Sequence, residues 1–217
     1  MNIGIILLGG KGLRLTPQSI FVNKHLNIIY DKPVFFYSLT ALILSGIDSL
    51  VMSCNKEDQS IFRKYSCYLS KIGLPTSVVT QPTSGGIPTA IQVCKNKIKK
   101  NSTVSVILGD NLLVGNDLIC HLNQNNEYKK SHAICFLKKV ADLKKFGVAR
   151  VDKNNKICDF LEKPTFVKSS DRAVIGFYQF PYSVFQVIGN LKPSKRGETE
   201  IIDILKHYKK KKLLKNI

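Results

Sequence analysis

The chain has 217 residues, of which 44% are hydrophobic and 22% charged. This length corresponds to one domain that buries about 70% of its unfolded surface, and the composition excludes an intrinsically disordered chain. Lys and Arg number 33 against 15 Asp and Glu, so the net charge is +18. Such a charge favours phosphate-bearing partners, although a codon bias toward lysine would produce the same excess.

The cysteines and the apolar runs favour a cytoplasmic protein. No C-x-x-C spacing occurs among the six cysteines, which argues against a zinc site or a disulfide framework and for a reducing compartment. No apolar run reaches about 18 residues, so we expect no membrane-spanning helix. The N-terminal run MNIGIILLGGKG has no basic flank and is typical of a buried strand rather than a signal peptide.

Strand and helix patterns alternate along the chain. The predicted strands cover residues 1–8, 50–54, 77–80, 103–108, 132–137, 148–151, 157–161 and 174–180, and residues 152–156 form a hairpin turn. The predicted helices cover residues 33–44, 57–69, 88–98, 183–191 and 198–210. This alternation predicts a single α/β domain over residues 1–217, with a mainly parallel sheet and helices on both faces. Ligands bind such sheets beyond the carboxyl ends of the strands.

A glycine-rich loop follows the first predicted strand. Gly9, Gly10 and Gly12 let the backbone turn and bring N–H groups close to an anion, and Lys11 and Arg14 add positive charge there. The loop lacks the G-K-[ST] of a Walker loop and does not fit G-x-G-x-x-G. We interpret it as a phosphate-binding loop, with an ordinary tight turn as the alternative.

Two further strand ends carry charged side chains. Asp110, in Gly109-Asp110-Asn111, is a candidate ligand for Mg²⁺, which takes one or two carboxylates plus phosphate oxygens. The alternative is an Asx turn or a helix cap. Lys163, in Glu162-Lys163-Pro164, could offer a point charge to a phosphate, or could be an ordinary surface ion.

Seven segments in collinear order together resemble the sugar-1-phosphate nucleotidylyltransferase family. They are GIILLGGKGLRLTP, NKHLNIIYDKPVFFYSLTALILSGI, QPTSGGIPTAI, VILGDNLLVGNDL, FGVARVDKNNKICDFLEKP, AVIGFYQFP and LKPSKRGETEIIDI. The resemblance spans residues 1 to about 208 and is greatest for the branch of glucose-1-phosphate thymidylyltransferases. It implies the three-layer, Rossmann-like fold of the nucleotide-diphospho-sugar transferases, with a mixed, mainly parallel sheet.

The resemblance also implies a reaction. A nucleotidyl group, most simply dTMP from dTTP, passes to glucose 1-phosphate and yields dTDP-glucose and pyrophosphate, with Mg²⁺ as cofactor. The nucleotide would be dTTP or UTP, and the product would serve cytoplasmic polysaccharide synthesis, for example through dTDP-rhamnose. The family resemblance is compatible with a homo-oligomer and implies neither a nucleic-acid partner nor a membrane.

Site residues follow from the positions that match the family motifs. The nucleotide would be bound by Leu8, Gly9, Gly10, Gly12, Gln81, Gly86 and Asp110. The sugar would be bound by Gly147, Glu162, Lys163 and Val174. Arg14, Lys24 and Lys163 would act on the reacting phosphates, and Asp110 would hold the metal. Gln81 would read the pyrimidine edge, because an amide can both donate and accept.

Three departures from the family pattern define the alternatives. Leu13 and His25 replace a threonine and a glutamine, and the chain lacks the Trp-containing C-terminal segment that supplies a second metal carboxylate in the family. Asp203 matches a different position. The second hypothesis is therefore a nucleotide- or nucleotide-sugar-binding relative with weakened or lost catalysis. A nucleic-acid binder is the least favoured hypothesis, because the lysines are spread along the chain without a recognised module.

Overall fold

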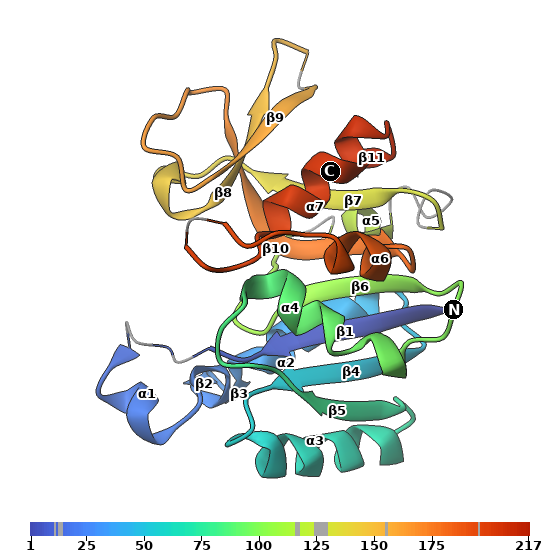
Figure 1. Ribbon diagram of the computed structural model, residues 1–217. Helices are drawn as coiled ribbons and strands as arrows, with labels where there is room; N and C mark the ends of the chain where they lie inside the picture. The colour runs from blue at the N-terminus through green and yellow to red at the C-terminus, as the bar shows by residue number, and fades with distance from the viewer. Residues whose placement is uncertain (11, 13–14, 116–117, 124–129, 155, 195) are drawn as a thin grey trace.

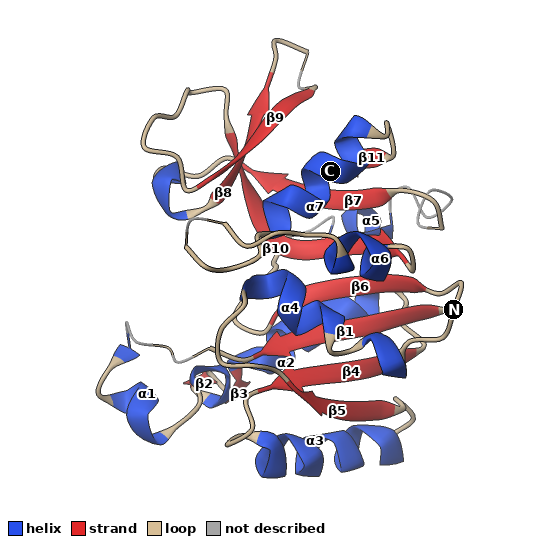
Figure 2. Ribbon diagram, viewed as in Figure 1, coloured by secondary structure: helices blue, strands red, loops and turns tan. Residues whose placement is uncertain are grey.

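The computed structural model describes residues 1–10, 12, 15–115, 118–123, 130–154, 156–194 and 196–217. Within them, nine strands form one sheet in the order β11-β7-β10-β6-β1-β4-β5, with β8 pairing with β10 and β9 pairing with β8 (Figure 2). These strands are β1 (Asn2–Leu8), β4 (Ser49–Cys54), β5 (Thr76–Thr80), β6 (Thr103–Leu108), β7 (Ala133–Lys138), β8 (Gly147–Val151), β9 (Ile157–Glu162), β10 (Arg172–Pro181) and β11 (Leu214–Asn216). A separate two-stranded ribbon joins β2 (Ile28–Ile29) and β3 (Lys32–Pro33).

The sheet is parallel around β1 and antiparallel around β10. Strand β1 pairs in parallel with both β4 and β6, and β5 pairs in parallel with β4. Strand β10 runs antiparallel to β6, β7 and β8. Six consecutive residues of β1, Ile3 to Leu8, are buried, as expected for a parallel strand that is covered on both faces. The predicted α/β fold with a mixed sheet is confirmed.

Helices cover both faces of the sheet (Figure 1). The helices are α1 (Gln18–Phe21), α2 (Val34–Leu44), α3 (Gln59–Lys71), α4 (Gly86–Gln92), α5 (Leu118–Asn123), α6 (Val184–Gly189) and α7 (Ile201–Lys210), of which α1 lies beyond the end of the sheet. One hydrophobic core joins α2, through Phe35 and Leu42, to Ile6 of β1. The other core joins Ile91 of α4 and Leu205 of α7 to Ile5, which points to the opposite face of β1. Successive side chains of β1 therefore belong alternately to two separate hydrophobic cores.

The boundaries of two helices differ from those that the sequence pattern predicts. The helix predicted over 198–210 begins at Ile201, because Glu200 has an extended backbone (φ −107°, ψ 136°). The helix predicted over 88–98 is α4 followed by a 3-10 turn at Lys95–Lys97. The sequence pattern does not predict α1, α5, the β2–β3 ribbon or β11, because these elements are short and carry little periodic signal.

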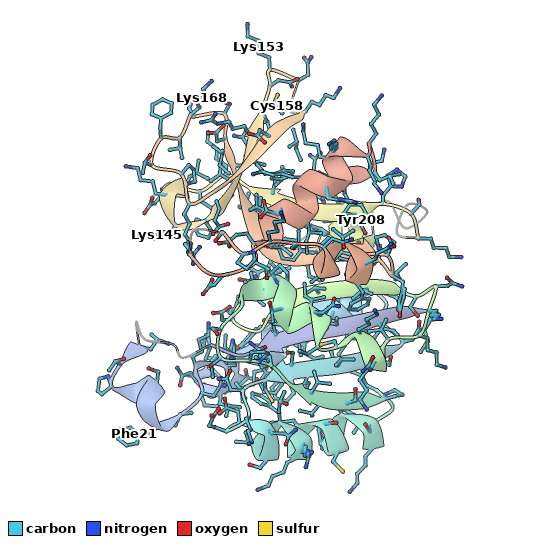
Figure 3. The ribbon with its side chains drawn as sticks, in the orientation of Figure 1. Phe21, Lys145, Lys153, Cys158, Lys168 and Tyr208 are labelled. Carbon is cyan, nitrogen blue, oxygen red and sulfur yellow. The ribbon has the colours of Figure 1, made fainter. Side chains whose placement is uncertain are left out.

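The carboxyl ends of the parallel strands meet at one edge of the sheet, on the left in Figure 1. Strands β8 and β9 form the hairpin that was predicted from the pattern around residues 152–156, and this hairpin lies above that edge in Figure 1. Phe21 of α1, whose exposed fraction is 84%, points away from the molecule at the same end (Figure 3). Among the described residues, no helix has the length and apolar character needed to cross a bilayer.

Candidate functional site

Two neighbouring cavities open at the carboxyl edge of the sheet. The first, of about 290 Å³, is lined among others by Gly9, Gly10, Lys24, Gln81 and Asp110. The second, of about 360 Å³, is lined among others by Gly147, Glu162, Lys163, Val174 and Arg196. The two cavities share Gly86, Ile87, Leu108 and Glu198. We refer to them as the glycine-loop cavity and the hairpin cavity.

Most of the predicted site residues therefore come together. Leu8 and Gly12 are described but do not line either cavity, and the side chain of Leu8 is buried in the core behind α2. Gly12 lies against Ser19 and Lys24 instead. Arg14, together with the neighbouring Lys11 and Leu13, lies outside the described residues.

In the glycine loop, Gly9 and Gly10 contact Gln81 and Asn55. A side chain at Gly9 would overlap with the amide of Gln81 and displace it from its present position. Gly10 has a φ of +100° and open space at its Cβ position, which suits glycine because other residues rarely adopt that backbone. The amide N–H of Gly10 donates to Asn55 Oδ1 over 3.3 Å.

Lys24 and Asp110 form an ion pair inside the glycine-loop cavity, with Nζ and Oδ2 separated by 2.5 Å. Asp110 follows β6, and Lys24 opens a 3-10 turn over Lys24–Leu26. Burial by itself would raise the pKa of Asp110, but the hydrogen bond and the charge of Lys24 outweigh it and hold that pKa below its ordinary value. The carboxylate is therefore ionised and available to a cation at neutral pH.

His25 lies beneath this pair and is almost fully buried. Its Nδ1 lies 2.8 Å from Asn23 Oδ1, and the Asn23 amino group donates to the Leu8 carbonyl over 3.1 Å. Burial, followed by the charge of Lys24, lowers the pKa of His25 to about 4. The imidazole is therefore neutral at physiological pH and adds no charge to the cavity.

The hairpin cavity combines carboxylates with cations. Gly147 and Glu162 lie directly opposite each other in the β8–β9 pairing. Arg196 Nη1 lies 3.3 Å from Glu162 and 3.5 Å from Glu200, and Lys163 Nζ lies 3.9 Å from Glu162. Burial, followed by the charge of Glu200, raises the pKa of Glu162 although Lys163 and Arg196 act in the opposite direction.

The backbone of Lys163 is strained. Its φ is +41°, a value that costs a non-glycine residue about 1–3 kcal/mol. The Lys163 N–H donates to the Phe146 carbonyl over 3.0 Å, so the turn is held in place by the segment before β8. Lys145, which precedes Phe146, projects from that segment (Figure 3). Strained backbone of this kind is concentrated at functional sites, and here it lies in the wall of the hairpin cavity.

Sequence reasoning missed several residues of the hairpin cavity. These are Asn111, Tyr178, Arg196, Glu198 and Glu200. The Asn111 Nδ2 atom is buried without a hydrogen-bond partner among the described residues, and it is packed against Gly176 in the wall of this cavity. The run of charges in SKRGETE was the available signal, but the helix pattern that begins there concealed it.

A hydrogen-bonded contact joins the walls of the two cavities. Thr199 donates from its backbone N–H and its hydroxyl to the Gly85 carbonyl, over 3.1 Å and 2.6 Å. Thr89 donates to the same carbonyl over 2.7 Å. A Cβ at Gly86 would overlap with the Thr199 carbonyl, so Gly86 is required by this contact whether or not a ligand is bound.

Acidic side chains are sparse around Asp110. Within the described ranges, no three His, Cys, Asp or Glu residues gather as a metal-binding group. Asp203 lies on α7 and pairs with Lys206 over 3.8 Å. Glu198 is the other carboxylate among the described residues of the glycine-loop cavity.

Comparisons with known proteins find a matching family and sequence relatives. The family described as "Nucleotidyl transferase" matches residues 3–216. The glucose-1-phosphate thymidylyltransferase of Neisseria gonorrhoeae is 36% identical over 206 residues, which are 94% of this chain and 70% of that protein. The enzyme of the same name from Mycolicibacterium smegmatis is 36% identical over 205 residues, with the same coverage.

Solved structures give the same result. A Bacillus anthracis protein assigned as a glucose-1-phosphate thymidylyltransferase, in complex with sucrose, has a TM-score of 0.89 and 33% identity, covering 100% of this chain and 86% of that one. A UDP-glucose pyrophosphorylase complexed with UDP-glucose has a TM-score of 0.82 and 25% identity. The match covers 97% of this chain and 88% of that one.

Proposed function

We propose that this chain, which belongs to the nucleotidyl transferase family, transfers a nucleotidyl group from a nucleoside triphosphate to a sugar 1-phosphate. The observation that carries the proposal is the pair of cavities that share one wall. The glycine-loop cavity fits a nucleotide, because bare backbone and Lys24 face it. The hairpin cavity fits a sugar phosphate, because carboxylates suit hydroxyl groups and Lys163 suits a phosphate.

The reaction joins the contents of the two cavities. An oxygen of the sugar phosphate attacks the α-phosphorus of the nucleotide, a new P–O bond forms, and the bond to the β-phosphate breaks to release pyrophosphate. Lys24 on one side and Lys163 on the other offset the charge that gathers on the phosphates. The shared wall brings the two substrates together, so positioning supplies much of the rate.

The residues present also fit one Mg²⁺ ion. Asp110 is ionised, 41% of its side chain is exposed, and Mg²⁺ needs only one or two protein carboxylates when phosphate oxygens complete its shell. Asp110 would hold the ion, and Glu198 is the other acidic side chain among the described residues of the same cavity. The ion would neutralise phosphate charge at the reacting centre.

We assign dTTP and glucose 1-phosphate as the substrates. The support is the identity of 32–36% to proteins named glucose-1-phosphate thymidylyltransferase. Gln81 in the glycine-loop cavity is consistent with a pyrimidine nucleotide. UTP is the competing nucleotide, since one structural neighbour at 25% identity is a UDP-glucose pyrophosphorylase.

A pyrophosphate-release assay tests the proposal. Each nucleoside triphosphate is combined with glucose 1-phosphate, with Mg²⁺ or with EDTA. We expect release with dTTP, none with EDTA, and a loss of about 10²-fold or more in kcat/KM for Lys163→Ala. Lys156→Ala, which removes a lysine from the same hairpin outside both cavities, is the matched control and should retain activity. Nucleotide binding without release would instead support the non-catalytic hypothesis.

A further inference from the structure

Ser53 lies behind Gln81, the residue that faces the nucleotide base in the proposed function. It belongs to β4 and its exposed fraction is 0%. Its hydroxyl lies 2.9 Å from Gln81 Oε1 and 3.2 Å from the Ala90 carbonyl, so two acceptors lie within reach of one proton. The orientation of the Gln81 amide depends on which acceptor receives that proton.

Cys94 provides a second donor for one of these two acceptors. Its thiol lies 3.5 Å from the same Ala90 carbonyl and donates to it. Burial raises the pKa of Cys94 to about 12, so the thiol keeps its proton at physiological pH. Since the Ala90 carbonyl already accepts from Cys94, and Gln81 Oε1 is the nearer acceptor at 2.9 Å against 3.2 Å, the Ser53 proton goes to Gln81 Oε1.

The other end of the amide then faces the ligand. Gln81 Nε2 lies against the Cα of Gly9, and both residues line the glycine-loop cavity. No hydrogen bond of Nε2 to another described residue is present. The amide therefore presents two N–H donors to the cavity, while its oxygen is held by Ser53.

We propose that Ser53 is a positioning residue that makes Gln81 a hydrogen-bond donor toward the base, so that the site selects 4-keto pyrimidines and rejects 4-amino pyrimidines. This inference rests on the proposed function. Thymine and uracil offer a carbonyl oxygen at position 4, whereas cytosine offers an amino group that would meet the donors of Gln81 without a partner. A buried Gln81 N–H without an acceptor weakens nucleotide binding by more than the loss of a hydrogen bond at an exposed surface does.

Binding calorimetry in Mg²⁺ without sugar phosphate tests this inference. The unmutated protein should bind dTTP and UTP at least about tenfold more tightly than dCTP. In Ser53→Ala the amide is free to rotate, so the preference for dTTP over dCTP should fall below about threefold. A general loss of structure would weaken both nucleotides together and leave their ratio unchanged.

Two further variants keep the test decisive. Ser66→Ala removes another buried serine hydroxyl, which donates to the Thr76 carbonyl over 2.8 Å outside both cavities, and should leave the ratio unchanged. Gln81→Glu leaves Ser53 in place but presents an acceptor, so dCTP should gain relative to dTTP even if Ser53→Ala does not fold.

The outcomes separate the two proposals. Equal binding of dTTP and dCTP by the unmutated protein, or an unchanged ratio in folded Ser53→Ala, would overturn the role of Ser53 and leave the nucleotide site intact. An unchanged ratio of dTTP to dCTP affinity in Gln81→Glu would also overturn the role of Ser53. Failure of the unmutated protein to bind any nucleoside triphosphate would contradict the proposed function as well.

Discussion

At the scale of single residues, the ion pair of Lys24 and Asp110 controls the charge of the glycine-loop cavity. The pKa of Asp110 is low because Lys24 outweighs burial, so removing Lys24 leaves burial as the main influence. We expect Lys24→Ala to raise the Asp110 pKa from below to above its ordinary value. Titration of the carboxyl ¹³C resonance measures the change, and an unchanged Asp110 pKa would contradict this account.

The same pair has a consequence for stability against pH. A lowered carboxyl pKa contributes stability above the unfolded pKa, and this contribution is lost as the pH falls through the folded pKa. Lys24→Ala should therefore lower stability at neutral pH and reduce its loss on acidification. Lys32→Ala, which removes the partner of exposed Asp31, is the control and should leave the Asp110 titration unchanged.

Gly86 gives a second prediction at this scale. Its φ is +81° and the space of a Cβ is filled by the Thr199 carbonyl, whereas Gly73 has a φ of +100° with open space. Gly73→Ala should lower the free energy of unfolding by about 1–2 kcal/mol through backbone strain alone. Gly86→Ala should cost about 1–3 kcal/mol more, because backbone atoms must move. Urea denaturation measures both, and equal losses would contradict the overlap with Thr199.

At the scale of elements, Thr199 ties the segment before α4 to the segment before α7. Thr199→Val removes the hydroxyl donor to Gly85 and keeps the backbone bond and the side-chain volume. We expect a loss of about 1 kcal/mol in the free energy of unfolding. KM for the sugar phosphate should rise several-fold, because Glu198 and Glu200 on either side line the hairpin cavity.

Thr40→Val is the matched control for this prediction. The Thr40 hydroxyl donates to the Phe36 carbonyl within α2, on the exposed side of the helix and outside both cavities. This variant should leave KM unchanged. An unchanged KM in Thr199→Val as well would show that the contact between the two segments does not influence sugar binding.

At the scale of the whole molecule, the net charge of +18 repels itself in the folded state. The screening length falls from about 30 Å to about 8 Å between 0.01 M and 0.15 M salt, so added NaCl should raise the free energy of unfolding over this range. Affinity for dTTP should fall over the same range, because the cations of the site are screened too. Parallel urea and calorimetric titrations check both, and stability that declines with salt would exclude self-repulsion as a net cost.

Local patterns in the sequence were sufficient for the longer helices and strands and for the strand ends that line the cavities. The apolar run of β1, the proline before α2 and the glycines after β1 each act within a few residues, so their effect is readable without the fold. Gln81, Asp110 and Lys163 follow strands, and strand ends in a parallel sheet meet at one edge. The resemblance to a family assigned their roles.

Contacts between distant segments were decided only by the tertiary structure. Lys24 meets Asp110 across 86 residues, Arg196 meets Glu162 across 34, and Thr199 meets Gly85 across 114. The charges of SKRGETE were visible, but a helical pattern does not reveal that Glu200 lies in an extended backbone before the helix. Nor does it reveal that Glu198 lines both cavities. Nothing in the sequence distinguishes Ser53 from the other residues of β4, and its proposed function depends on its position behind Gln81. A sequence specifies such partners through the packing of the whole sheet, because the hydrogen bonds of a side chain depend on the neighbours that the fold brings to it.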